Sequence, residues 1–373
     1  MKVKLNHSVF FLVVGRLGKS LVTSKALPII HASKISQVYI FSQVKGAELH
    51  GISYVTIPKW IINLKPNLLR NLLRLFYEPI QLLYYAIKFR PGYINGVYTL
   101  PKGLNSLIVG WLVGSKSIVS VIGGKKEIET YLPFTSLWKE LNIWILKKAD
   151  IVTTKGEVIS EYLVKNGVRS SKIFTLNGSI QVKFKLLPDV NRNIDVLFCG
   201  NFSELKGPNR VVQVIEKFYQ ENIPINAVFV GSGKLYNFIE KEINKKGLKN
   251  IKLLGHVENT EYYFQRSKLL LMPSSSEGLS TAMLEAMACG CVPVVSNVGA
   301  MTEAALHEKN AIVVDDYKDI NGFFQHAKYL LNNKSKWAEL SNNGINIVKT
   351  KYTPIAQSFI INEIIFELTK RQT

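Results

Sequence analysis

The chain has 373 residues, of which 47% are hydrophobic, and its 47 Lys and Arg outnumber 27 Asp and Glu to give a net charge of +20. This length predicts two or three domains, and the hydrophobic fraction excludes an intrinsically disordered chain. The most apolar long stretch, Leu68–Phe89, is interrupted by charges and a proline, so no segment offers the roughly 18 uninterrupted apolar residues of a membrane-spanning helix. Three cysteines, two of them separated by one glycine, exclude a disulfide framework and favour a reducing cytoplasm.

The positive charge is concentrated in the first half of the chain. Residues 1–190 hold 26 Lys and Arg against 9 Asp and Glu, or +17, whereas residues 191–373 hold 21 against 18, or +3. This asymmetry indicates an anionic surface or ligand that only the first half meets. Anionic lipid and nucleic acid both fit, and simple solubility is the alternative.

Short apolar runs typical of buried strands alternate with segments of helical spacing along the whole chain. The expected strands are Val9–Val14, Val38–Phe41, Leu107–Val109, Ile118–Ile122, Ile151–Thr154, Ile173–Leu176, Val196–Cys199, Ala227–Val230, Ile251–Leu254, Leu269–Met272, Val292–Ser296 and Ala311–Val314. The expected helices include Phe134–Lys148, Gly156–Asn166, Asn209–Gln220, Leu235–Lys246, Thr281–Ala288 and Pro354–Lys370. This alternation predicts the α/β class with parallel sheets.

The alternation runs twice, with a break in the proline-containing stretch 186–191, where the charge balance also changes. We therefore expect two Rossmann-like doubly wound domains facing each other across a cleft: an N-terminal acceptor-binding domain, residues 1–188, and a C-terminal nucleotide-sugar-binding domain, residues 189–352. Residues 353–373 are expected to form a C-terminal helix, for which packing on the N-terminal domain is one option. Ligands of such sheets bind beyond the carboxyl ends of the strands.

A glycine-containing loop, Gly15–Ser20, follows the first expected strand. It is no Walker A loop, because that motif requires a glycine five residues before its second glycine, where Val13 stands. We interpret Gly15 as part of a loop that lines the cleft.

The segment most informative about chemistry follows the expected strand Leu269–Met272. Glu277 precedes the next helix, and Glu285 lies inside that helix, eight residues later. The first backbone N–H groups of this helix, for which Ser280 or Thr281 is the expected cap, form an anion site together with the helix dipole. One carboxylate beside a phosphate-binding turn points to sugar hydroxyls, and the second points to a ribose. The alternative is an ordinary helix N-terminus with a solvated glutamate.

The 27-residue context of these glutamates, EGLSTAMLEAMACGCVPVVSNVGAMTE at residues 277–303, resembles the signature of retaining nucleotide-sugar glycosyltransferases of family four, which have the GT-B fold. The resemblance implies that Glu277 contacts the donor sugar and that Glu285 binds the ribose hydroxyls. It also implies that the backbone of Gly278, Leu279 and Ser280 contacts the sugar and the diphosphate.

Two further segments resemble the donor domain of that family. In residues 195–207, Lys206 matches the lysine that clamps the diphosphate, so that Lys206 and Glu277 are the expected catalytic residues; Asn201 stands where arginine is usual. His256 and Val257 occupy the position at which the family holds the base through backbone atoms. We assign no proton transfer to His256.

The resemblance implies a retaining, metal-independent hexosyltransferase that needs no cofactor. The chain has no Asp-x-Asp motif that would imply a metal clamp, and fixed positive groups aimed at the leaving diphosphate lower the barrier instead. A histidine is usual on the N-terminal side of the cleft, but Gly123 and Gly124 stand at the matching place. Their backbone is expected to approach the sugar; the alternative is a catalytically degenerate nucleotide-sugar-binding protein.

The donor is expected to be a UDP- or GDP-sugar, and the acceptor a glycan or lipid-linked glycan in cell-surface polysaccharide assembly. The segments Lys59–Lys65 and Leu68–Arg90 mix aromatic and aliphatic residues with Lys and Arg, which is typical of a helix lying on anionic lipid. We therefore favour a cytoplasmic protein held peripherally on the inner membrane face; a buried amphipathic helix is the alternative. A nucleic-acid partner is a further hypothesis, and no nucleic-acid-binding motif supports it.

Overall fold

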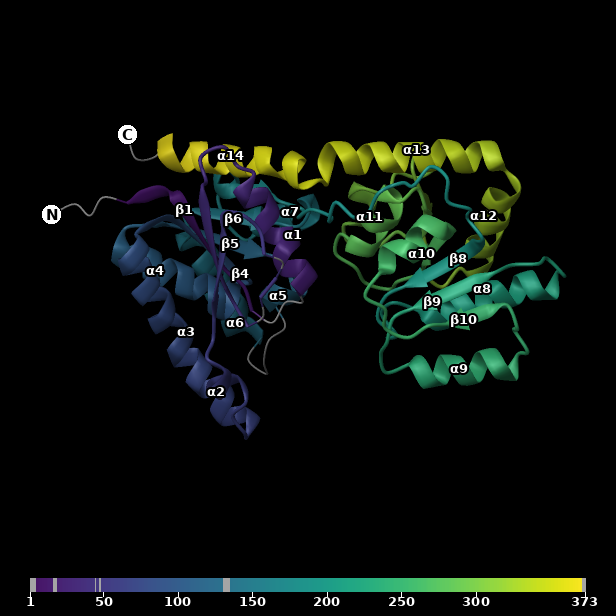
Figure 1. Ribbon diagram of the computed structural model, residues 1–373, viewed down its shortest axis with the longest axis horizontal. Coiled ribbons are helices and arrows are strands. Elements are labelled where there is room, and N and C mark those ends of the chain that lie inside the picture. The colour runs from purple at the N-terminus through teal and green to yellow at the C-terminus, as the bar shows by residue number, and fades with distance from the viewer. Residues whose placement is uncertain (1–4, 16–18, 44, 47, 130–134, 371–373) are drawn as a thin grey trace. The chain divides into compact units, whose positions relative to one another are not determined.

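The computed structural model describes residues 5–15, 19–43, 45–46, 48–129 and 135–370. The chain forms two compact units (Figure 1). The first comprises residues 1–181 together with 353–373, and the second comprises Val182–Tyr352.

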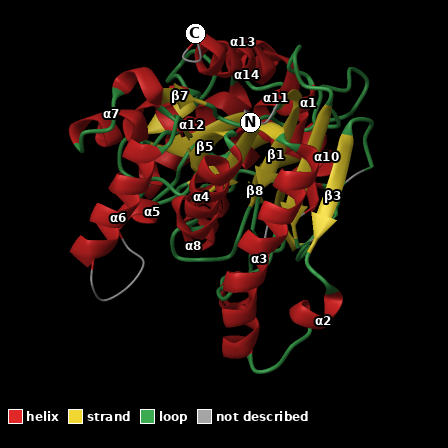
Figure 2. Cartoon of the chain, turned by 90° about the vertical axis from the view of Figure 1, so that its left-hand side faces the viewer, coloured by secondary structure: helices red, strands yellow, loops and turns green. Residues whose placement is uncertain are grey.

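The first unit is built on a seven-stranded parallel sheet of order β3-β2-β1-β4-β5-β6-β7. Its strands are β1 (Asn6–Val13), β2 (Gln37–Ser42), β3 (Ile52–Thr56), β4 (Pro91–Val97), β5 (Lys116–Val121), β6 (Ile151–Thr154) and β7 (Ile173–Thr175). Its helices are α1 (Lys19–Ile30), α2 (Lys59–Ile62), α3 (Asn67–Phe89), η1 (Thr99–Gly103), α4 (Leu104–Val113), α5 (Lys125–Glu129), α6 (Thr135–Lys148), α7 (Glu157–Lys165), η2 (Ser170–Lys172) and α14 (Pro354–Lys370). Figure 2 shows this sheet flanked by helices.

The second unit is built on a six-stranded parallel sheet of order β10-β9-β8-β11-β12-β13. Its strands are β8 (Ile194–Cys199), β9 (Ala227–Val230), β10 (Ile251–Leu253), β11 (Ser267–Met272), β12 (Val292–Ser296) and β13 (Ile312–Val314). Its helices are α8 (Pro208–Gln220), α9 (Tyr236–Lys245), α10 (Thr260–Arg266), α11 (Thr281–Ala288), η3 (Met301–Glu303), α12 (Ile320–Asn332) and α13 (Lys334–Lys351).

The predicted α/β class with two parallel sheets is confirmed. The central strands β8, β9, β11 and β12 are almost continuously apolar and buried, as expected for strands covered by helices on both faces.

The predicted strand at Leu107–Val109 is wrong, because these residues lie in the middle of α4. The helix buries Ser106, Val109 and Gly110, which are spaced to share one helical face, and it ends at Gly114, whose φ of 82° is the left-handed conformation that glycine adopts readily. A short β-branched run cannot be distinguished from a buried helical face by composition alone.

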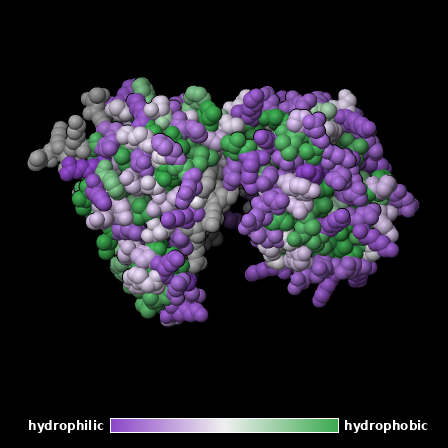
Figure 3. All heavy atoms as spheres, in the orientation of Figure 1, coloured by the Kyte–Doolittle hydropathy of each residue, from purple (hydrophilic) through white to green (hydrophobic). Residues whose placement is uncertain are grey.

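Only part of α3 packs on the sheet of the first unit. Leu82 and Ala86, near its C-terminal end, are buried in a cluster with Phe41 and Val55 of β2 and β3. The N-terminal turns of α3 extend past the sheet together with α2 (Figures 1 and 2), and hydrophobic residues lie on this edge of the unit (Figure 3). The alternative of a buried amphipathic helix therefore holds only for the C-terminal turns of α3, and the N-terminal turns are exposed.

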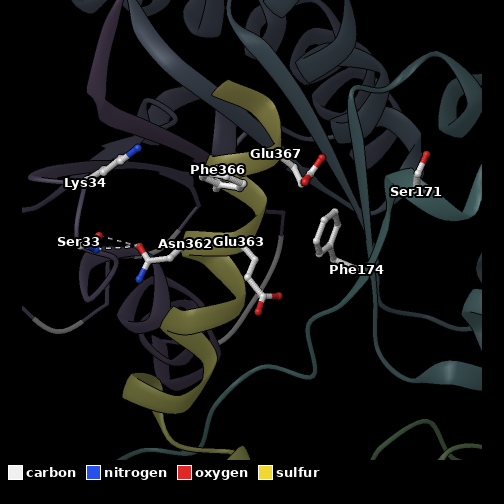
Figure 4. A pocket seen from close by; sticks show the side chains of 8 residues that line it. All are labelled: Ser33, Lys34, Ser171, Phe174, Asn362, Glu363, Phe366 and Glu367. Carbon is white, nitrogen blue, oxygen red and sulfur yellow. Dashed lines mark hydrogen bonds between the residues drawn. The ribbon is translucent and has the colours of Figure 1, made fainter. Parts of the chain in front are cut away.

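The C-terminal helix α14 belongs to the first unit. Its residues Ile361, Ile364 and Leu368 share a core with α1, and Asn362 accepts hydrogen bonds from the backbone N and Oγ of Ser33 at 2.9 and 3.1 Å (Figure 4). The expected packing on the N-terminal domain is thus confirmed. A hollow of about 700 Å³ beside α14 lies near the amino ends of β2 and β7, the opposite edge from the one where ligands of such sheets bind.

Candidate functional site

The order of the second sheet reverses between β8 and β11, since β9 and β10 lie on one side and β12 and β13 on the other. In open α/β sheets the crevice beyond the carboxyl ends of the strands at such a switch point is the usual ligand site. The loop after β8 carries Asn201 and Lys206, and the loop after β11 carries Glu277. The fold therefore brings together two motifs that lie 71 residues apart in the chain.

Lys206 and Glu277 form an ion pair across this switch point. The Lys206 Nζ lies 2.5 Å from Glu277 Oε1, which also accepts a hydrogen bond from Ser274 Oγ at 2.9 Å. The Glu277 side chain is only 6% exposed, whereas that of Lys206 is 30% exposed. The carboxylate is thus held at a fixed place, and the ammonium group remains accessible to an anion.

Further contacts fasten the two loops to each other. Ser275 N donates to Leu205 O at 2.8 Å, and Arg210 of α8 donates to Pro273 O at 2.7 Å and to Glu204 O at 2.9 Å. The Arg210 guanidinium also lies over the Tyr317 ring, 4.9 Å from its centroid. Sequence reasoning missed Arg210, because an arginine in a helical segment carries no signal of the two carbonyl groups that it joins.

A close backbone approach also fixes Glu277. Gly299, which follows β12, has a φ of 59°, and a Cβ atom there would lie 1.8 Å from the carbonyl oxygen of Glu277. No side chain fits this position. The signal available in the sequence was the glycine in the turn after a strand, within the stretch that resembles the family signature.

The loops after β8, β9 and β10 lie side by side at the same edge. Phe202 N donates to Ser232 O at 3.0 Å, and Gly231 N donates to Gly255 O at 2.8 Å. These bonds place Asn201 and the pair His256 and Val257 on neighbouring loops, with Asn201 and His256 both exposed.

The start of α11 departs from one expectation. Ser280 is the N-cap residue, but its side chain makes no capping hydrogen bond; its Oγ lies 3.9 Å from Met272 Sδ instead. The first N–H groups of the helix therefore gain no partner from this side chain. Gly278 is exposed in the preceding turn, and Leu279 and Ser280 are buried.

Glu285 is the second acidic residue of the motif. Burial raises its pKa to about 8, with Lys183 opposing the shift and Glu261 adding to it. Within the described part of the chain, no donor hydrogen-bonds to this carboxylate. Burial and the nearby Glu285 also raise the pKa of Cys199, the last residue of β8, to about 12.

The expected cleft-lining residues lie at the carboxyl edge of the first sheet. Gly15 follows β1, and Gly123 and Gly124 follow β5; residues 16–18 of the glycine loop lie outside the described residues. Glu127 holds the turn at Gly123: its carboxylate accepts hydrogen bonds from the backbone N of Ile122 and Gly123 at 2.9 and 2.6 Å and from the backbone N and Oγ1 of Thr99 at 2.8 and 3.0 Å. Sequence reasoning passed over Glu127, whose signal was the first acidic residue after a segment dominated by Lys and Arg.

Among the described residues, no group of three or more His, Cys, Asp or Glu side chains has a geometry that could hold a metal ion. In the same part of the chain, no helix is both long and apolar enough to cross a bilayer.

Residues 181–347 match the family model described as Glycosyl transferases group 1. This matched part, which makes up most of the second unit, is similar to that family. An uncharacterized glycosyltransferase of Methanocaldococcus jannaschii is 29% identical over 150 residues, which are 40% of this chain and 41% of that protein. The capsular polysaccharide biosynthesis glycosyltransferase CapH of Staphylococcus aureus is 29% identical over 174 residues, 43% of this chain and 48% of CapH. The chain thus spans about half the length of the curated relatives it matches.

Solved structures show the same two-domain fold. Anabaena HepE in complex with UDP-glucose superposes with a TM-score of 0.74 at 15% identity, covering 97% of this chain and 99% of HepE. Sucrose-phosphate synthase from Thermosynechococcus elongatus gives a TM-score of 0.74 at 15% identity, covering 98% of this chain and all 100% of that one. The predicted GT-B fold is confirmed, and the match of residues 181–347 supports the predicted family.

Proposed function

We propose that this group 1 glycosyltransferase transfers a hexosyl group, with retention of anomeric configuration, from a UDP-sugar to a lipid-linked glycan acceptor. The observation that carries the proposal is the Lys206–Glu277 pair at the switch point of the second sheet. HepE structures that contain UDP and UDP-glucose favour UDP over GDP as the nucleotide. The similarity to CapH favours a role in cell-surface polysaccharide assembly. The basic first half of the chain favours a place in the cytoplasm at the inner membrane face.

Different residues of the second unit would bind different parts of the donor. Lys206 and the N–H groups at the start of α11 would face the diphosphate, Glu277 would accept hydroxyls of the sugar, and Glu285 would accept the two ribose hydroxyls. The backbone of Gly278, Leu279 and Ser280 would line the sugar and diphosphate. Asn201 would add an uncharged donor, and the backbone at His256 and Val257 would border the base.

This arrangement would act on the transition state. As the anomeric carbon–oxygen bond breaks, negative charge grows on the departing diphosphate, and a fixed ammonium group with helix N–H groups stabilises it without reorganisation. Lys206 must then exchange part of its contact with Glu277 for the diphosphate. We propose that this transfer needs no metal ion, because these groups supply the positive charge at the leaving group.

A thermal-shift series with UDP, GDP, ADP and their glucose conjugates, with and without magnesium, tests the donor assignment. Saturating UDP-glucose at about 100 times its Kd should raise the melting temperature by about 5 °C, and magnesium should not change this shift. A larger shift with GDP or ADP would overturn the choice of base. A shift that appears only with magnesium would overturn the metal-independent site.

The second candidate function is a catalytically degenerate nucleotide-sugar-binding protein. It is favoured by Asn201 at the usual arginine position and by Gly123 and Gly124 at the usual histidine position. Both functions predict UDP-glucose binding, so turnover separates them: release of UDP in the presence of membrane extract supports the transferase, and binding without release supports the degenerate protein.

A further inference from the structure

The exposed face of α3 is almost entirely apolar. Eleven of its residues are exposed, and only Asn67, Asn71 and Lys88 among them are polar. The others are Leu68, Leu69, Leu72, Leu75, Phe76, Ile80, Tyr84 and Ile87. Phe76 and Ile80 are each 66% exposed, far more than residues that merely border a core. These eight side chains form a stripe along the helix, because most are spaced three or four residues apart.

The neighbouring helices carry further exposed apolar side chains. Trp60 of α2 is 61% exposed, and Trp111 of α4 is 81% exposed, with Ile108 and Leu112 exposed beside it. Helices α2 and α4 both contact α3. We call the exposed apolar side chains of α2, α3 and α4 the apolar face of the first unit; Figure 3 shows hydrophobic residues along the edge where α3 runs.

The opposite side of α3 is fixed to the unit by buried charges. Glu78 pairs with Lys102 of η1 and with Arg74 on its own helix, and the three side chains are between 8% and 18% exposed. Gln81 donates a hydrogen bond to Thr56 O at 3.2 Å. The helix is therefore held in one rotational position, and this position turns the apolar stripe outward.

The charge along the segment that carries the apolar face has one sign. Residues 59–113, which span α2, α3 and α4, hold seven Lys and Arg and a single acidic residue, Glu78. Because Glu78 is buried in its ion pairs, no carboxylate of this segment opposes an anionic surface. A helix with an apolar face, bordered by tryptophans and basic residues, has the composition of one that lies in the interfacial layer of a bilayer.

We propose that the apolar face formed by α2, α3 and α4 inserts into the interfacial layer of a membrane that contains anionic lipid. The helices lie in the membrane plane, with Phe76, Ile80 and the two tryptophans at the depth of the headgroup and acyl boundary. The Lys and Arg of the same segment that do not pair with Glu78 bind the lipid phosphates.

The same elements lie next to the ligand edge of the first sheet. Lys102 belongs to η1, which follows β4, and the order of this sheet reverses between β1 and β4. The Glu78–Lys102 pair thus ties the membrane helix to the carboxyl edge at a switch point. A saccharide carried on a lipid in the bound membrane would therefore emerge near this edge. This last step rests on the proposed function, whereas the membrane contact does not.

Co-sedimentation of the full chain with vesicles tests the proposal. We expect binding to phosphatidylcholine vesicles that contain phosphatidylglycerol, and weaker binding to phosphatidylcholine alone or at high salt. The variant Phe76→Gln/Ile80→Gln should lower the partition coefficient at least about tenfold, because both side chains lose their transfer from water. The matched control Tyr219→Gln/Phe238→Gln replaces exposed side chains of the second unit and should bind as the unchanged protein does.

A spectroscopic readout locates the contact. Trp111→Phe keeps an apolar ring, so it should retain vesicle binding while losing much of the blue shift in tryptophan emission. No binding of the unchanged protein to anionic vesicles, or an equal loss in the control, would overturn the proposal. Concentration-dependent self-association that the Phe76→Gln/Ile80→Gln variant abolishes, without vesicle binding, would identify the face as a protein interface instead.

The thermal shift with UDP-glucose keeps the two proposals distinguishable. The Phe76→Gln/Ile80→Gln variant should keep that shift unchanged, since the exchanged residues belong to the first unit. Failure of vesicle binding with an intact shift would remove only the membrane contact. Failure of the shift with intact vesicle binding would remove only the donor assignment.

Discussion

The two units share one topology but use the same place in it differently. In the second unit the switch point holds Lys206 and Glu277 on two loops, with the ammonium group accessible and a further carboxylate, Glu285, without a hydrogen-bond donor in the described residues. At the corresponding edge of the first unit, Lys102 is buried against Glu78, and the Glu127 carboxylate accepts hydrogen bonds from backbone N–H groups. The charged groups thus form a candidate binding site in one unit and brace the backbone in the other. A charged residue at a ligand edge therefore does not by itself indicate catalysis.

The largest effect that separates the units is expected at Lys206. Lys206→Met should lower kcat by about a hundredfold to a thousandfold, because the leaving diphosphate loses its fixed positive charge. Steady-state release of UDP measures this. Lys241→Ala, which removes an exposed lysine of α9, is the control and should leave kcat unchanged. An unaltered kcat in Lys206→Met would show that Lys206 of the second unit, like the charged groups of the first, does not act on the substrate.

In the first unit the expected effect is on stability. Glu78→Gln should lower the free energy of unfolding by about 3 kcal/mol, because Lys102 and Arg74 stay buried without their carboxylate. Urea unfolding of the full chain measures the change. The double variant Glu78→Gln/Lys102→Met, which removes the stranded ammonium group, should recover much of the loss. If Glu78→Gln instead abolished turnover at full stability, Glu78 would be a substrate-binding residue.

Because of Glu285, a rise in pH is expected to have opposite effects on the stability of the fold and on the affinity for the donor. Its pKa of about 8 in the fold lies above the ordinary value of 4.5, so the folded protein binds a proton that the unfolded chain releases between these two pH values. Stability therefore falls as pH rises from about 4.5 to 8 and is constant above. Glu285→Gln should remove this slope and stabilise the ligand-free protein at pH 8 by on the order of 2–4 kcal/mol.

Binding should respond in the other direction. The ribose hydroxyls donate to the ionised carboxylate, so the affinity for UDP-glucose should rise as pH increases through about 8. Glu285→Gln should abolish this rise and weaken binding about tenfold at pH 8.5. Calorimetric titrations of the unchanged protein and of Glu285→Gln from pH 6.5 to 8.5 measure the two affinities. A pH-independent affinity of the unchanged protein would contradict the role of Glu285.

The smallest effect is expected at Arg210, which acts through the loops that it joins. Arg210→Lys keeps the charge but cannot reach both Pro273 O and Glu204 O, so kcat should fall about threefold to tenfold with little change in KM. The pH dependence of UDP-glucose binding should stay as in the unchanged protein. A shift in that dependence would mean that Arg210 acts on the donor site directly.

The second unit was more accessible to sequence reasoning than the first. Its helix Thr281–Ala288 has the predicted bounds, and every strand predicted in it has a counterpart in its sheet. In contrast, β3 and β4 were not predicted, and Leu107–Val109 was assigned to the wrong type of element. Periodicity is informative where apolar runs are bounded by turns, and it fails where an apolar stretch continues through several elements.

By itself the sequence determined the α/β class, the family resemblance and the identity of the candidate donor residues, because strand patterns and the motif around Glu277 and Glu285 are local. Only the tertiary structure decided that Lys206 pairs with Glu277, that Gly299 leaves no room for a side chain beside Glu277, and that Arg210 joins the two loops. It also decided which side of α3 is exposed. Each of these depends on contacts between segments distant in the chain, and such contacts leave no periodic signal in the sequence.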